Sequence, residues 1–173
     1  MILEVAEASM PAAVRREMYA RACDLVEDRS IPIDVRARMT FHAERNLEAM
    51  FLLEQVAERA PARGAAESSI EALRLALEAA RRDSRTDAEG RPSEVVLVFG
   101  RKLGDALLRA GRLVEADSLL RELIDLVGPE SPDGMLIMRG LARVARAESQ
   151  SGEGHVVQAG ALGGLQAVAT RTR

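Results

Sequence analysis

Aromatic residues are nearly absent from the sequence: Phe, Tyr and Trp together make up 2% of its 173 residues, and Trp does not occur. Strands of β-sandwiches and barrels draw on aromatic and β-branched residues, so this composition argues against an all-β fold. It also leaves few platforms on which the bases of single-stranded nucleic acid could stack. The sequence therefore predicts an all-α protein that does not bind nucleic acid.

Lysine, cysteine and net positive charge are also scarce. The net charge is −3, so no overall positive field would attract nucleic acid or an anionic membrane surface. Lys102 is the only lysine among many arginines, a bias typical of a GC-rich, bacterial genome. Cys23 is the only cysteine, so no intramolecular disulfide can form, and we predict a cytoplasmic protein. The longest uncharged stretch, residues 154–170, contains Gln158 and four glycines, which makes it too short and too polar to cross a bilayer.

Motifs that carry catalytic or cofactor chemistry are missing as well. The sequence has no phosphate-binding glycine loop and no Gly-x-Ser-x-Gly turn, and it has no paired carboxylates in a known signature. The two histidines, His42 and His155, do not form a zinc motif with the single cysteine. Residues 83–94 faintly resemble a calcium loop, but Arg85 occupies a ligand position. We therefore predict no metal, no cofactor and no catalytic residue, and we expect that the protein is not an enzyme.

Apolar residues recur at helical spacing along most of the chain, with short breaks between the segments. They predict about seven helices, over residues 9–28, 34–60, 65–82, 93–110, 113–127, 131–149 and 155–173. Ser93 and Ser131 are expected to cap the helices that follow them, and Gly111 is expected to form a tight turn. Val95 to Phe99 could form a buried strand, but no second strand is available to pair with it, so we predict a helix there.

The same spacing predicts which side chains are buried. In the helix expected over residues 34–60, one broad apolar face contains Met39, Leu47, Met50, Phe51, Leu53 and Val56. Cys23 lies on an apolar stripe and is expected to be a buried small residue. Met135 and Met138 could form an adaptable binding patch, but packing in the core is the favoured interpretation.

One segment of the chain resembles a tetratricopeptide repeat. Residues 103–116 read Leu-Gly-Asp-Ala-Leu-Leu-Arg-Ala-Gly-Arg-Leu-Val-Glu-Ala, followed by Leu120 and Leu123 and ending at Pro129. In that family the Leu-Gly pair lets two helices approach closely, and the later Ala lies where the paired helices touch. The loop at residues 126–132, and the 44-residue separation between Ala72 and Ala116, are similar to the longer repeats of kinesin light chain.

This resemblance implies an all-α fold built as a right-handed superhelical array of antiparallel helix hairpins, a tetratricopeptide-like α-solenoid. Residues 1–30 would form an N-terminal helix that packs on the array. Residues 31–173 would form the repeats, with the clearest unit at 94–129. The chain ends without the polar capping helix that a solenoid normally needs. Two interpretations stay open: the chain is a fragment of a longer protein, or a partner covers this end.

The resemblance also implies a binding groove, because the first helix of each pair in such proteins lines a concave surface that binds extended peptides. Arg101, Asp105 and Arg109 are spaced four apart on one such helix. Aligning Leu141-Ala142 with Leu103-Gly104 places three more arginines on the matching face of the next helix, namely Arg139, Arg143 and Arg146. Together they predict a basic groove suited to an acidic protein segment. The alternative is an ordinary solvated face, with Asp105 paired to Arg101 or Arg109.

We therefore expect a non-catalytic protein–protein interaction module, acting as an adaptor, a scaffold or a chaperone, whose partner is a protein or peptide rather than nucleic acid or membrane. Two alternatives remain. One is a self-associating structural domain, a homodimer, within a bacterial signalling or regulatory protein. The other is an all-helical enzyme with an unrecognised site.

Overall fold

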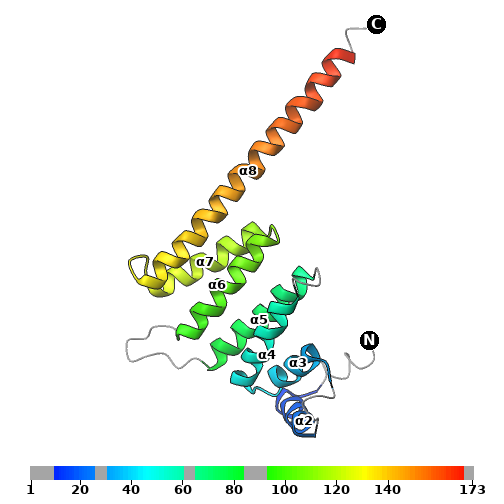
Figure 1. Cartoon of the computed structure of the whole chain (residues 1–173), viewed down its shortest axis with the longest axis vertical. Helices are drawn as coiled ribbons and strands as arrows, with labels where there is room; N and C mark the ends of the chain where they lie inside the picture. Colours follow the sequence, from blue (N-terminus) through cyan, green and yellow to red (C-terminus); the bar gives the residue numbers. More distant parts are fainter. Residues whose placement is uncertain (1–9, 26–30, 61–64, 84–92, 170–173) are drawn as a thin grey trace.

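The structure, a computed structural model, describes residues 10–25, 31–60, 65–83 and 93–150, together with the helical backbone of residues 151–169 (Figure 1). All regular secondary structure in these residues is α-helical, without a strand. The helices are α2 (Ala12–Leu25), α3 (Ile33–His42), α4 (Asn46–Arg59), α5 (Ala66–Asp83), α6 (Glu94–Arg109), α7 (Leu113–Val127) and α8 (Pro132–Ala169).

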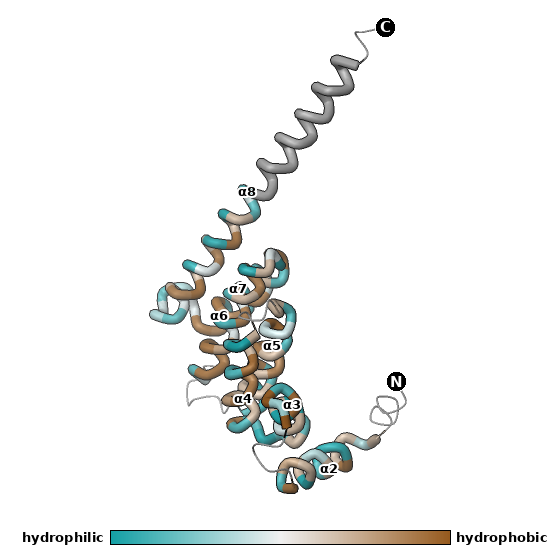
Figure 2. Tube along the Cα trace, turned by 45° about the vertical axis from the view of Figure 1, so that its right-hand side comes forward, coloured by the Kyte–Doolittle hydropathy of each residue, from teal (hydrophilic) through white to brown (hydrophobic). Residues whose placement is uncertain are grey.

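Each helix packs against the next one along the chain, and α6 additionally contacts α8. One hydrophobic core runs from α3 to the first half of α8. Its largest fully buried side chains include Leu53, Ile70, Leu107, Leu123 and Ile137. Figure 2 shows hydrophobic residues concentrated where α4, α5 and α6 meet, and Figure 1 shows α8 continuing beyond the other helices as a single straight rod.

Several local features confirm the predictions from sequence. The Ser93 side chain accepts a hydrogen bond from the backbone N–H of Val95 at 3.3 Å, and the segment after it is a helix rather than a strand. The Ser131 hydroxyl oxygen accepts one from Gly134 N–H at 2.9 Å, so it caps α8. Gly111 has φ +73°, which a residue without Cβ adopts at little strain, and it lies in the turn between α6 and α7.

The single helix predicted over residues 34–60 is wrong, because the chain turns between α3 and α4. Glu44 has φ +56°, a left-handed conformation that is uncommon for residues other than glycine. The backbone N–H of Arg45 donates to the carbonyl of Thr40, and that of Glu44 to the carbonyl of Phe41. These two bonds are the Schellman pattern that ends a helix. The turn brings two side chains predicted as core to the surface: Leu47 is 72% exposed and Phe51 is 64% exposed.

The break predicted between residues 149 and 155 is also wrong, since α8 is continuous from Pro132 to Ala169. Glycine lowers helix propensity by about 1 kcal/mol per residue but does not remove the backbone hydrogen bonds that continue a helix. Met135 and Met138 are exposed rather than buried in the core, on a face of α8 that no other described helix covers. Cys23 is partly exposed instead of buried.

Some predictions fall on residues that the structure does not describe. The polar loop that resembles a calcium site lies mostly within residues 84–92, which are outside the described ranges, and the side chain of His155 is outside them too. In the described part of the chain, no three His, Cys, Asp or Glu side chains are grouped so that they could hold a metal ion. None of the helices there has the length and apolar character needed to cross a membrane.

Candidate functional site

Four of the six predicted binding residues line one groove between α6 and α8. Arg101 and Asp105 come from α6, and Arg139 and Arg143 come from α8. The groove has a volume of about 340 Å³, and its remaining lining residues are Leu120, Leu136 and Gly140. The structure therefore brings together residues that lie almost forty positions apart in the sequence.

The floor of this groove is Leu120, a side chain of α7 that reaches in between the two other helices. A Cβ atom added at Gly104 of α6 would lie 2.9 Å from Cδ2 of Leu120, and one added at Gly140 of α8 would lie 3.0 Å from its Cδ1. At 2.9 Å one partner must shift, and at 3.0 Å the neighbour must give way by a few tenths of an ångström. Leu120 thus occupies space that exists only because both positions are glycine.

The alignment of α8 with α6 that matched Leu141-Ala142 to Leu103-Gly104 stays a prediction. On α8 it is Gly140, and not Ala142, that approaches Leu120 of α7, and Ala142 is exposed. The arginines predicted from this alignment nevertheless include two that line the groove, because Arg139 and Arg143 are one helical turn apart.

Two ion pairs join α6 to α8 along the groove. Arg143 donates to Asp105 with an Nη1–Oδ1 distance of 2.5 Å, and Arg101 lies 3.4 Å from Asp133 at the start of α8. The alternative prediction, in which Asp105 pairs with Arg101 or Arg109 on its own helix, is therefore wrong. All four groups remain partly exposed, so each pair contributes only about 0–1 kcal/mol to stability. The pairs restrict how Arg101 and Arg143 are oriented.

Arg139 differs from its neighbours in the groove because it forms no ion pair with any described residue. It is exposed, and it lies on α8 between the positions of Asp133 and Arg143. With Arg101, Arg143 and the two carboxylates, it gives the groove one positive charge that is not balanced by these partners. A planar guanidinium in this setting is suited to bind a carboxylate through two parallel hydrogen bonds.

The other two predicted residues lie beside the groove rather than in it. Arg109, at the end of α6, lines a second hollow of about 250 Å³ on the α4 side, which Glu54, Glu58 and Lys102 also line. Arg146 is exposed on α8, one turn beyond Arg143, and does not contribute to the groove.

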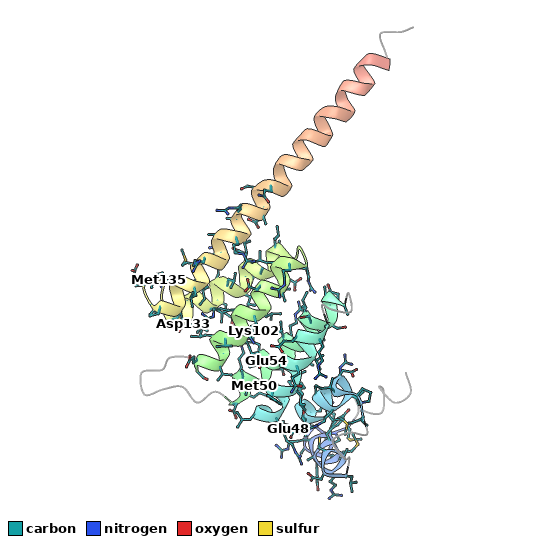
Figure 3. The ribbon with its side chains drawn as sticks, viewed as in Figure 1. Glu48, Met50, Glu54, Lys102, Asp133 and Met135 are labelled. Atoms are coloured by element: carbon teal, nitrogen blue, oxygen red, sulfur yellow. The ribbon has the colours of Figure 1, made fainter. Side chains whose placement is uncertain are left out.

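Three exposed apolar side chains lie on α4 and at the start of α6, and the sequence analysis did not identify them as surface residues. Lys102 of α6 forms an ion pair with Glu54 of α4 (Figure 3), which links the two helices. Leu47 lies seven residues, or two turns, before Glu54 on α4, and Val95 lies seven residues before Lys102 on α6. Both are exposed, and Phe51 lies on the same side of α4. Leu47 and Phe51 have the spacing of core residues, so nothing in the sequence distinguishes them as surface residues.

A hollow between α5 and α7 is the main competing site, with a volume of about 540 Å³. Its charged residues are already paired across the two helices: Arg74 with Glu115, and Arg81 with Glu122 at 2.6 Å. A hydrogen bond from Arg112 and the nearby charge of Arg74 hold the pKa of Glu115 below its ordinary value. Because its carboxylates and guanidiniums bind one another, this hollow is a weaker candidate for a charged ligand than the α6–α8 groove.

Comparisons of the chain with protein-family models, with curated proteins and with solved structures give no match.

Proposed function

We propose that the protein is a non-catalytic interaction module in which the α6–α8 groove binds an extended, acidic segment of a partner protein, as an adaptor, scaffold or chaperone does. In this proposal α4 to α8 form a right-handed, tetratricopeptide-like array of hairpins. Such an array places every second helix side by side. Ion pairs join α4 to α6 and α6 to α8, and a separate ion pair joins α5 to α7, which supports this arrangement. The observation that carries the proposal is the Arg139 guanidinium, which has no ion-pair partner among the residues that the structure describes and lies beside the apolar side chains of Leu120 and Leu136.

The groove would bind its partner by preorganisation. A carboxylate of the partner accepts two hydrogen bonds from Arg139, while Arg101 and Arg143 are already oriented by Asp133 and Asp105. Because these side chains are held before the partner arrives, binding loses less conformational entropy than it would with free arginines. Leu120 and Leu136 accept an apolar side chain of the same segment at the floor.

The exposed apolar residues of α4 extend this surface. A segment that leaves the groove across α6 reaches Leu47, Val95 and Phe51, where a second apolar side chain would lose contact with water. Exposed aromatic and aliphatic residues next to a charged site are typical of protein interfaces. We therefore expect a partner segment in which acidic and apolar residues alternate within a few positions.

Binding is favoured over catalysis because the carboxylate of the groove is already engaged. Asp105 is held by Arg143, so it is poorly placed to move a proton to or from a substrate. Self-association, the other alternative, rests on a different surface, the outer face of α2.

The test is binding of a fluorescent peptide library that combines acidic and apolar residues, measured by anisotropy at 50 and 300 mM salt. Arg139→Glu should weaken the best binder about ten- to hundredfold, since a hydrogen bond to a charged group contributes about 1.5–3 kcal/mol. Arg38→Glu, an exposed arginine of α3 outside the groove, is the matched control. Equal affinity of the two variants, or a library without any binder, would contradict the proposal.

A further inference from the structure

The helix α2 is attached to the rest of the molecule through one face only. The ring of Tyr19 stacks on His42 at 4.9 Å, and Arg16 forms an ion pair with Glu44 at 3.2 Å. Arg45 donates to the backbone carbonyl of Ala20 at 3.3 Å. Among the residues of α2, all of which the structure describes, none is buried. The contacts that hold this helix to the end of α3 and the turn after it are therefore mainly polar and aromatic rather than a packed core.

The opposite face of α2 is apolar and faces water. Val14, Met18 and Leu25 are 51%, 42% and 84% exposed. At about 100° of rotation per residue these three side chains fall within about 40° of one another, roughly opposite Arg16 and Tyr19. They line a shallow hollow of about 340 Å³, together with Glu17, Arg21 and Ala22. A helix with this stripe is expected to cover it against another surface.

We propose that a second copy of this chain covers the stripe, with the two α2 helices antiparallel. Glu17 and Arg21 lie on the same flank of the stripe and at equal distances on either side of residue 19. A twofold axis at the level of residue 19 brings Glu17 of one copy next to Arg21 of the other, and the same contact occurs twice. The apolar ends of the stripe, Val14 and Leu25, then meet across the axis.

The charges favour this arrangement over a parallel one. In an antiparallel pair of helices the same flank of each copy meets, so the acid and the base face each other. In a parallel pair the flank with Glu17 and Arg21 would meet the flank with Arg15 and Ala22, where Glu17 could pair with Arg15 but Arg21 would meet no acidic residue. In the single chain Glu17 and Arg21 bind each other at 2.6 Å. They can exchange partners on dimerisation without leaving a charge unpaired.

The expected dimer is weak. A face of one 14-residue helix is small beside stable interfaces, which bury about 1,200–2,000 Å² in total. We expect mainly monomer at about 5 µM and a substantial fraction of dimer at about 500 µM, the range typical of small, transient interfaces. The proposal does not depend on what the α6–α8 groove binds. A dimer would carry two such grooves, so that a partner with two acidic segments would bind more tightly than one segment does.

Sedimentation equilibrium of the full chain between 5 and 500 µM tests the proposal. Met18→Asp should weaken association at least tenfold, because it places a charge at the centre of the stripe. Val114→Asp changes an exposed apolar residue of α7 and should leave the dissociation constant unchanged. Circular dichroism of each variant shows that the helices remain folded.

A charge-exchange experiment separates direct contact from a general effect on folding. Glu17→Arg and Arg21→Glu should each weaken self-association, because each brings like charges together in the dimer. A mixture of the two variants should recover association as a heterodimer, and so should the double exchange in a single chain. A chain that stays monomeric at 500 µM overturns the proposal, as does a dimer that neither Met18→Asp nor the charge variants affect. A stripe protected from hydrogen exchange or oxidation in a monomer would show that it is covered within its own chain, which also overturns the proposal.

Discussion

The substitution Gly104→Ala tests how tightly α6, α7 and α8 are packed around Leu120. An alanine in the middle of a helix is more favourable than glycine by about 0.8–1 kcal/mol, so an uncrowded site would gain stability. Here the new Cβ would lie 2.9 Å from Cδ2 and 3.3 Å from Cγ of Leu120. Leu120 is 3% exposed, and its Cδ1 atom lies close to the backbone of Gly140, since a Cβ added there would be 3.0 Å away. A buried side chain between two helix backbones has few positions to which it can shift.

Overpacking a well-packed core costs about 1–3 kcal/mol. The crowding therefore outweighs the gain in helix propensity, and we expect Gly104→Ala to lower the free energy of unfolding by up to about 2 kcal/mol. In a Leu120→Ala background the crowding atoms are gone. There the same substitution should raise the free energy of unfolding by up to about 1 kcal/mol, because only the propensity gain remains.

The assay is urea denaturation of the four chains that form this double-mutant cycle, followed by circular dichroism. Leu120→Ala alone should cost about 2–5 kcal/mol, and if that chain is partly unfolded without urea, Leu120→Val replaces it. A change of sign between the two backgrounds supports the packing described above. The same sign in both backgrounds would refute the reasoning, because it would mean that Leu120 does not limit the space at residue 104.

Three further predictions concern single groups. Glu44→Gly should raise the free energy of unfolding by about 0.5–1 kcal/mol in urea denaturation, because glycine adopts a positive φ with less strain. Glu115 has a folded-state pKa below its unfolded value, chiefly because Arg112 hydrogen-bonds to its carboxylate. The ionised carboxylate therefore stabilises the fold at any pH above the unfolded pKa, and this stabilisation is lost as the pH falls through the folded pKa. Glu115→Gln should therefore reduce the loss of stability between pH 6 and pH 3 in urea denaturation. Burial raises the pKa of the Cys23 thiol, and the nearby Arg45 partly offsets this rise. Alkylation of Cys23 by iodoacetamide at pH 8 should therefore be slower than that of an unstructured cysteine peptide. It should be slower still in Arg45→Met, which removes the charge that lowers the pKa.

Each of these expectations has a clear contrary result. A less stable Glu44→Gly chain would mean that the ion pair of Glu44 with Arg16 contributes more than the backbone strain. An unchanged acid dependence in Glu115→Gln would mean that the carboxylate binds its arginines equally in the unfolded chain. A Cys23 that is alkylated as fast as the peptide would show that the thiol is not shielded from water by α3.

Two Schellman turns among the described residues, after α3 and after α6, show what a single sequence can predict. After α6, Arg112 N–H donates to the carbonyl of Leu107 and Gly111 has a positive φ, so a glycine marks the turn in advance. After α3 the same pattern of hydrogen bonds forms around Glu44. The sequence has no glycine at that position from which the turn could be predicted. The predicted number of helices equals the seven in the described part of the chain. The numbers agree only because the one helix expected over residues 34–60 is two helices, and the two expected over residues 131–149 and 155–173 are one.

Part of the candidate site could also be predicted from the sequence. Helical spacing was enough to place Arg139 and Arg143 on one face of α8, and the resemblance to a known repeat suggested that this face lies beside Arg101 and Asp105. The register between the helices was not available from the sequence, so the prediction placed Asp105 among the arginines of the groove without identifying Arg143 as its partner. Partners across helices depend on packing distances that spacing along one helix does not determine.

The position of Leu120 has a consequence for how this surface can change over evolution. The walls of the groove, with their charges, belong to α6 and α8, whereas its depth is set by a side chain that enters from α7 behind them. A smaller residue at position 120 would deepen the floor without altering any arginine, and a change of arginine would alter the charge without altering the floor. Selection can therefore act on the size and on the charge of the accepted side chain through different helices, one substitution at a time.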